Sequence, residues 1–199
     1  MINDQRNKSL IASGDQKKFR QLMELTSDDL LLFAMGFLKE KETAEEIVSD
    51  VYVKIWNNRK DLLKVKNIKS YLFISVKNGC LSHLRKSRNK NIISIDEFEE
   101  YNFEYIFLPV DAPEDDLIEQ ETVNLIYQAI DKLPPKCKLA FTLAKVNGLK
   151  YKEIAEIMNV SEKTVNNHLV NAVNKISEIL SITKKSNDKP VSMNRASLF

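Results

Sequence analysis

Residues 151–180 decide the fold, and they read YKEIAEIMNVSEKTVNNHLVNAVNKISEIL. Apolar side chains at positions 151, 154, 155 and 158 have the i, i+3, i+4, i+7 spacing of a short amphipathic helix. Asn159 and Val160 interrupt this pattern, and Ser161 offers a side-chain oxygen that can cap a second helix. That helix has its own apolar set, formed by Val165, Leu169, Ala172 and Ile176. The stretch therefore predicts two helices joined by a tight turn.

The N-terminal end of the second helix has the composition of a DNA-reading helix. Its outward side chains are predicted to be Lys163, Thr164, Asn166, Asn167 and Val170. Asn can pair bidentately with adenine, Lys can reach guanine, and Val can contact a thymine methyl group. The alternative is an ordinary αα-hairpin with a solvated polar face, because short helix pairs are common in all-α proteins. The pattern favours a helix-turn-helix.

Composition points to an all-α chain with a packed core. The 199 residues suffice for one large or two small domains, and 43% of them are hydrophobic. Gly occurs only 4 times and Pro 5 times, which favours helices over turn-rich sheets. The N-terminus is polar, and no apolar run approaches the ~20 residues of a membrane span, so a cytoplasmic protein is expected.

The cysteines do not indicate a disulfide framework or a metal site. Cys80 and Cys137 lie far apart in helical patterns, which is typical of buried thiols in a reducing compartment. Cys80 and His83 share a helix face, but two ligands do not make a zinc site. No metal and no cofactor are expected.

The N-terminal half predicts four helices after a polar lead of 14 residues, which is expected to be loose or a short helix. They begin at residues 15, 27, 44 and 70, with Thr43 as the expected cap of the third and Tyr71 on the apolar face of the fourth. Taken alone, the third helix is best interpreted as a core helix with a solvated face. A loop over residues 59–67 separates the third and fourth helices.

Charge is distributed in blocks along the chain. Residues 64–90 contain eight Lys or Arg and no Asp or Glu, whereas residues 96–131 contain twelve Asp or Glu and no Lys or Arg. The basic block is interleaved with Tyr71, Phe73 and His83, which could stack on unpaired bases, so it is typical of a phosphate-binding surface. A solvated basic face is the alternative. The acidic stretch 96–116 contains two prolines and predicts a linker that repels nucleic acid.

Three stretches in this order resemble the sigma-70 family of bacterial RNA polymerase sigma factors, in its extracytoplasmic function (ECF) group. They are AEEIVSDVYVKIW from residue 44, SYLFISVKNGCLSHLRK from residue 70, and the region from AIDKLPPKC at residue 129 through the helix-turn-helix to residue 176. The resemblance implies two small helical domains: sigma region 2 over residues 1–95 and sigma region 4 over residues 117–183. An acidic linker (96–116) joins them, and a flexible tail (184–199) follows.

The resemblance also implies roles for individual residues. The stretch from residue 44 resembles the helix that binds the clamp helices of the polymerase β′ subunit, which implies polymerase contacts at Glu46, Ser49, Asp50, Val53 and Trp56. The loop 59–67 and the helix after it resemble the part that captures and reads the −10 strand. The implied contacts there are Arg59, Lys66, Lys69, Lys77, Asn78 and Arg85. The outward residues of the second helix of the helix-turn-helix would read the −35 element.

Some positions depart from the family pattern. Ser49 stands where the family often has Gln, Ser82 where it often has Asp, and Asn166 and His168 where it often has Arg. The last departure leaves the preferred promoter sequence open. The arginine-poor reading helix and the lysine-rich composition resemble factors from Bacteroidetes-type genomes.

The resemblance implies a transcription initiation factor and not an enzyme, with no small-molecule substrate. Its partners would be core RNA polymerase, through the β′ clamp helices and the β flap, promoter DNA, and an anti-sigma factor, often the cytoplasmic end of a membrane protein. Two alternatives remain open. One is a stand-alone helix-turn-helix regulator, although no dimer helix is visible. The other is an interaction protein that binds polymerase or an anti-sigma factor without reading a promoter.

Overall fold

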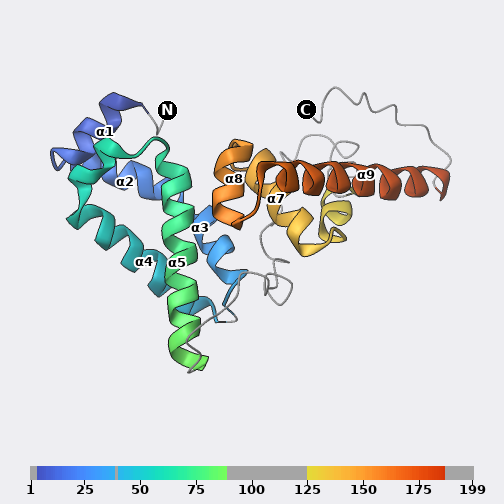
Figure 1. Ribbon diagram of the computed structural model, residues 1–199, viewed down its shortest axis with the longest axis horizontal. Coiled ribbons are helices and arrows are strands. Elements are labelled where there is room, and N and C mark those ends of the chain that lie inside the picture. Colours follow the sequence, from blue (N-terminus) through green and yellow to red (C-terminus); the bar gives the residue numbers. More distant parts are fainter. Residues whose placement is uncertain (1–3, 39, 89–124, 187–199) are drawn as a thin grey trace, which may run out of the picture.

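All regular structure in the described residues is helical, which confirms the predicted fold class (Figure 1). The computed structural model describes residues 4–38, 40–88 and 125–186, so the predicted acidic linker and nearly all of the predicted tail lie outside it. The elements are α1 (Gln5–Ala12), α2 (Gln16–Glu24), α3 (Ser27–Met35), α4 (Lys41–Asn57), the 3₁₀ helix η1 (Arg59–Lys64), α5 (Ile68–Arg88), α7 (Pro135–Lys145), α8 (Tyr151–Met158) and α9 (Glu162–Ser186). Residues 125–131 are also helical.

Side-chain caps set where several helices begin. Asp15 accepts a hydrogen bond from the backbone N–H of Lys18 at 3.0 Å. The predicted cap at Ser161 is confirmed, because Ser161 accepts a hydrogen bond from the backbone N–H of Thr164 at 3.1 Å. The predicted cap at Thr43 is wrong, because α4 begins at Lys41, three residues before the predicted start at residue 44. Glu40 has the extended backbone of an N-cap residue, and its carbonyl accepts the first helical bond, from Ala44 at 3.2 Å.

The N-terminal part, residues 4–88, packs α1 to α5 around one apolar core. Phe33 is central to it, with its ring 5.0 Å from that of Phe73 and 5.1 Å from that of Phe37. Phe73 is therefore buried, and the prediction that it stacks on an unpaired base is wrong. Tyr71 was expected on the apolar helix face and also as a ring that could stack on bases. The first expectation is wrong, because Tyr71 is exposed while Leu72, Val76 and Cys80 occupy the face that meets the core.

Helices α4 and α5 lie against each other at Gly79. A Cβ atom at this position would lie 2.8 Å from Cγ2 of Ile47, closer than such atoms approach in folded proteins. The glycine therefore permits the close approach of the two helices.

The C-terminal part, residues 125–186, is built on α7, α8 and α9. The predicted inward residues of α9 are all buried: Val165, Leu169, Ala172 and Ile176. Pro135 begins α7 as predicted, and Asn159 turns the chain between α8 and α9 with a left-handed φ of 53°. The helix-turn-helix is thus confirmed, and α9 continues to Ser186.

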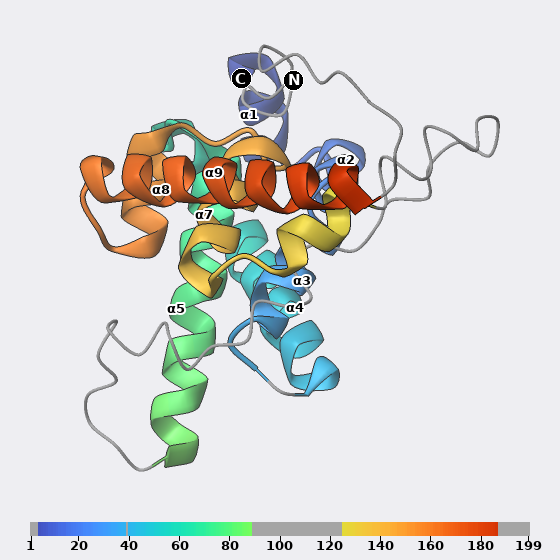
Figure 2. The ribbon, with the colours of Figure 1, turned by 90° about the vertical axis from the view of Figure 1, so that its right-hand side faces the viewer.

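The two parts contact each other through α5 and α8. Figures 1 and 2 show α8 beside the N-terminal half of α5, with α9 running across the direction of α5. None of the helices in the described ranges is both long enough and apolar enough to cross a membrane.

Candidate nucleic-acid and polymerase interface

The predicted DNA-reading residues lie together at the N-terminal end of α9. Lys163, Asn166, Asn167 and Val170 are exposed, and Val170 retains 49% of its accessible surface. Thr164 is half-buried, and its hydroxyl lies 2.8 Å from that of Ser161, within the cap. The arrangement presents amide, ammonium and methyl groups on one face, next to a helix N-terminus that favours phosphate.

His168 is turned away from this face and lies against α7. Its Nδ1 atom is 3.7 Å from the Sγ atom of Cys137, and its side chain is half-buried. Burial lowers the pKa of His168, and the nearby positive charge of Lys136 lowers it further. Burial likewise raises the pKa of the Cys137 thiol. The pair is therefore a hydrogen-bonded contact between neutral groups, apart from the face predicted to read DNA.

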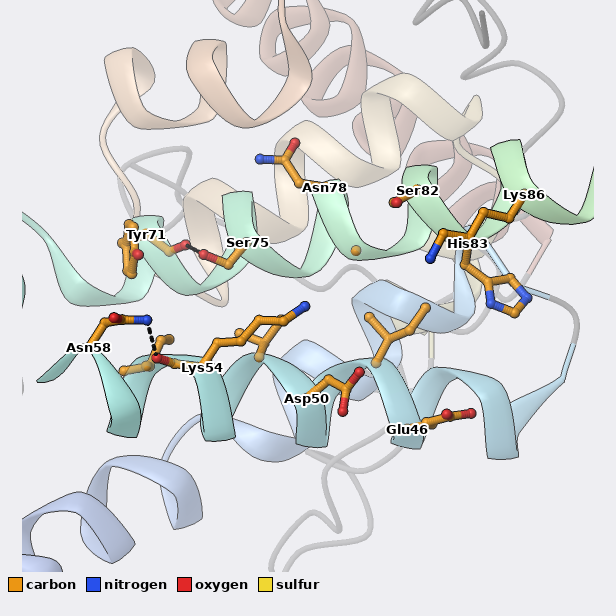
Figure 3. A pocket seen from close by; sticks show the side chains of 14 residues that line it. Glu46, Asp50, Lys54, Asn58, Tyr71, Ser75, Asn78, Ser82, His83 and Lys86 are labelled. Carbon is orange, nitrogen blue, oxygen red and sulfur yellow. Dashed lines mark hydrogen bonds between the residues drawn. The ribbon is translucent and has the colours of Figure 1, made fainter. Parts of the chain in front are cut away.

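A polar groove of about 620 Å³ runs between α4 and α5 (Figure 3). Figure 3 shows Glu46, Asp50 and Lys54 on α4 and Asn58 directly after it, with the residues that line the groove from α5 on the opposite side. The row on α5 consists of Tyr71, Ser75, Asn78, Ser82, His83 and Lys86. Both charge signs, hydroxyl groups and an aromatic ring are thus available along one channel.

Only part of this groove could be predicted from the resemblance. Glu46, Asp50 and Asn78 were predicted site residues, whereas Lys54 and Ser75 were not. A signal for the α5 side was present in the sequence: positions 71, 75, 78, 82 and 86 recur every three or four residues and hence share one helix face.

A second groove, of about 690 Å³, lies on the other side of α4, against α2. It is lined by Ser49, Val53 and Trp56 of the predicted polymerase set and by aromatic and thioether side chains of the core edge, Phe19, Met23 and Tyr52. The predicted polymerase contacts are therefore divided between two flanks of α4. The acidic pair faces α5, and the apolar members face α2.

The loop between α4 and α5 is largely helical and is held in place at its start. Residues 59–64 form η1, and the Arg59 guanidinium donates to the Trp56 carbonyl at 3.1 Å while stacking 4.9 Å from the centre of the indole ring. Lys66 is exposed at the end of the loop. Lys69 forms an ion pair with Asp29 at 2.9 Å, and only 20% of its side chain is exposed.

Lys77 is buried beneath α8. Its ammonium donates to the carbonyl oxygens of Glu156 at 3.4 Å and Ile157 at 2.9 Å, and 7% of the residue is exposed. Burial lowers the pKa of Lys77, while the Glu156 carboxylate acts in the opposite direction. Nearby, the Asn67 amide donates to the Glu153 carboxylate at 2.6 Å. In this conformation the helix-turn-helix therefore covers one predicted −10 residue, whereas Asn78 and Arg85 are exposed.

Comparison with known proteins identifies both parts. Residues 22–90 match the family described as Sigma-70 region 2, and residues 124–183 match the family described as Sigma-70, region 4. The ECF RNA polymerase sigma-E factor of Haemophilus influenzae is 24% identical over 175 residues, which is 86% of this chain and 92% of that protein. The RNA polymerase sigma-H factor of Pseudomonas aeruginosa is 21% identical over 181 residues, or 89% and 93% of the two chains.

Solved structures show the same fold. CnrH, in complex with the cytosolic domain of CnrY, aligns with a TM-score of 0.52 at 19% identity and covers 90% of this chain and 98% of its own. The sigma factor RpoE of Bartonella quintana, in complex with the anti-sigma factor NepR, aligns with a TM-score of 0.52 at 23% identity, covering 83% and 98%. The two regional matches occur in the order of the sequence resemblance and together span well over half of the chain. This chain therefore belongs to the sigma-70 family, in its extracytoplasmic function group.

Proposed function

We propose that the chain binds core RNA polymerase and directs it to a defined set of promoters, where it helps to open the duplex. The observation that carries this function is the presence in one chain of both sigma regions, each with an exposed polar surface of the right kind. The reading end of α9 is suited to duplex DNA, and the basic α5 with its preceding loop is suited to a separated strand.

The duplex-reading role is assigned to the exposed end of α9. Lys163, Asn166, Asn167 and Val170 would enter the major groove at the −35 element, with Thr164 supporting the cap. No partner copy is needed for this reading, because the polymerase itself holds the factor on the promoter.

The strand-binding role is assigned to the loop 59–67 and to the exposed face of α5. Lys66, Asn78 and Arg85 are accessible in the present conformation, and the groove adds Tyr71, His83 and Lys86. Unstacking costs a few kcal/mol per base, and stacking on an aromatic side chain returns about 1–3 kcal/mol per base. Tyr71 is the exposed ring on α5 that is best placed for this stacking. Lys77 would become available only when α8 leaves α5.

The polymerase-binding role is assigned to α4. Its two flanks offer different chemistry: Glu46 and Asp50 supply charge on one side, while Val53 and Trp56 supply an apolar surface on the other. Such a surface fits a helical partner that carries both basic and apolar side chains. The β′ clamp helices are the partner proposed for α4, and the β flap is the partner proposed for the C-terminal part.

The remaining features of the proposal are regulatory and cellular. One solved relative was captured with the cytosolic domain of CnrY and the other with the anti-sigma factor NepR. The second complex supports an anti-sigma partner here, often anchored in a membrane. We further propose that the factor has no catalytic activity, that it acts in the cytoplasm, and that it is of the Bacteroidetes type, on the basis of its arginine-poor reading helix.

Run-off transcription tests the function directly. Core polymerase is supplied with a fragmented genomic library, with and without the chain. New transcripts that start at defined sites are the expected result, and their upstream sequences give both promoter elements. Absence of such transcripts, together with tight specific binding to duplex DNA by the chain alone, would establish a stand-alone regulator instead.

A further inference from the structure

We infer that Lys8 is a positioning residue for the loop that holds the separated −10 strand, an inference that rests on the role proposed above for residues 59–67. Lys8 lies on α1, which precedes the Sigma-70 region 2 match that begins at residue 22. Only 4% of Lys8 is exposed. A lysine is almost never buried to this extent unless its ammonium group is bonded.

The ammonium of Lys8 binds the backbone at the end of the loop. Its Nζ atom donates to the carbonyl oxygen of Val65 at 2.7 Å and to that of Lys66 at 2.9 Å. These carbonyls belong to a short non-helical segment between η1 and α5, in which Val65 has an extended backbone. A non-helical segment leaves such carbonyls without helical donors, and here a side chain supplies the donor to both. Lys8 does so from 57 residues away in the sequence.

The bonded segment sets the position of the residues that come directly after it. Lys66 itself is exposed and is a proposed strand contact. The next residue, Asn67, caps α5 by accepting from the backbone N–H groups of Lys69 at 3.0 Å and Ser70 at 3.3 Å. A displacement of this segment therefore moves both the Lys66 side chain and the first turn of α5, from which Tyr71 projects into the groove.

The loop is held from more than one side. Arg59 bonds the end of α4 at the loop's start, and Leu62, only 2% exposed, is packed inside the core at its centre. Helix α1 packs against η1 and supplies Lys8 at the loop's end. Strand capture benefits from a surface that is already in its binding shape, because ordering it on binding would lower the affinity.

Stability alone does not explain an ammonium at this place. A buried charge held by neutral carbonyls is often no more stable than an apolar side chain of the same volume. Methionine would have a similar length, but it would leave both carbonyls without their donor. The Lys8→Met variant therefore removes both hydrogen bonds to the loop while keeping most of the packing.

The experiment compares strand binding with polymerase binding in the full chain. Holoenzyme is assembled with wild type, Lys8→Met, Lys8→Arg or Lys17→Met, the last being the same change at an exposed lysine on α2. The probe is a fluorescein-labelled non-template oligonucleotide that spans the −10 element of a promoter found by run-off transcription. Its anisotropy gives strand affinity, and competition with labelled wild-type chain gives core affinity. Circular dichroism checks helix content, and Lys8→Leu, which also lacks a donor, replaces Lys8→Met if the latter does not fold.

Lys8→Met is expected to bind the strand about tenfold more weakly, the scale of one lost charge-assisted hydrogen bond. The affinity for core polymerase should stay within about twofold of wild type. This is well below the tenfold change expected for the strand, which corresponds to ~1.4 kcal/mol. Lys8→Arg should recover most of the loss, because guanidinium can donate to both carbonyls, and Lys17→Met should match wild type. Equal strand affinity of Lys8→Met and wild type would overturn the inference, as would an equal loss of strand and core affinity. A wild-type holoenzyme that binds no such strand and starts no specific transcripts would refute the proposed function instead.

Discussion

At the scale of single residues, the reading end of α9 places short polar groups where longer basic side chains are common in the family. An amide can pair with two atoms of one adenine, and each such pair discriminates against the wrong base. Asn167 is exposed on this face, one turn after the cap at Ser161–Thr164. If this end of α9 reads the −35 element as proposed, its specificity is expected to depend more on directional hydrogen bonds than on charge.

Asn167→Ala is expected to weaken binding to the −35 element by about 1–3 kcal/mol, the value of one bidentate contact with a base. Transcription from the cognate promoter should fall as a result. Core polymerase binding should be unchanged, because the residue lies away from α4. Asn174→Ala is the matched control, since Asn174 is exposed on the same helix beyond the reading end. Run-off transcription at limiting factor concentration measures the effect. Equal losses from the two variants would contradict the assignment.

His168 gives a prediction about pH at the same scale. Burial, and then Lys136, lower its pKa from the ordinary value of 6.5, so the folded state prefers the neutral ring. The stability from this preference is present above pH 6.5 and is lost as the pH falls below it, where the unfolded chain takes up the proton first. His168→Gln should therefore lose less thermal stability between pH 7.5 and pH 5.5 than wild type. Thermal melts followed by circular dichroism test this, and parallel losses would count against it.

At the scale of elements, the N-terminal part depends on how closely α4 and α5 approach. The two helices form the walls of the polar groove, and Gly79 sets their separation because a Cβ atom would meet Ile47 at 2.8 Å. The same α4 separates the polar groove from the apolar one against α2. A change in the separation of α4 and α5 is therefore expected to alter the polar groove between them.

Gly79→Ala is expected to destabilise the N-terminal part by about 1–3 kcal/mol through overpacking, reduced by up to ~1 kcal/mol of gained helix propensity. Urea denaturation followed by fluorescence of the single tryptophan, Trp56, reports on this part of the chain. Ser82→Ala, an exposed change on the same helix, should have little effect. The cost of Gly79→Ala should shrink in an Ile47→Ala background, because the opposing methyl group is gone. Additive costs would refute the contact.

At the scale of the whole molecule, the helix-turn-helix is docked on the helix proposed to bind the −10 strand. Lys77 donates to two carbonyls at the C-terminal end of α8, and Asn67 bonds Glu153. The contact is polar at these points, and a charged group is buried in it. Interfaces of this kind between parts of one chain open readily. Separation of the two parts would expose the Lys77 ammonium, which could then bind the −10 strand as proposed.

Lys77→Glu is expected to separate the two parts. The new carboxylate would face the Glu156 and Ile157 carbonyls and the negative end of α8, where a helix favours cations by about 0.3–1 kcal/mol at exposed sites and up to ~2 kcal/mol when partly buried. Small-angle X-ray scattering should then show a larger radius of gyration than for wild type. Lys86→Glu reverses a charge on the exposed side of the same helix and should leave the radius unchanged. An unaltered radius for Lys77→Glu would show that this bond does not hold the parts together.

The local organisation of this protein is determined by its sequence, because it depends on periodicity and on caps. The helix-turn-helix, the inward residues of α9, the start of α7 at Pro135 and the caps at Asp15 and Ser161 are all encoded within a few residues of where they act. The order of the two sigma regions can likewise be read from the sequence. The prediction that Thr43 caps α4 was wrong because Glu40, three residues earlier, has the extended backbone that an N-cap residue requires.

Only the tertiary structure decided which basic residues remain accessible. Lys8, Lys69 and Lys77 look like any other lysines in the sequence, yet one bonds the loop end, one pairs with Asp29, and one is buried under α8. For the same reason Phe73, which was expected to be available for stacking, is buried, and Tyr71, which was expected on the apolar face, is exposed. Whether a side chain is buried depends on which distant helix packs against it, and that information is absent from local spacing.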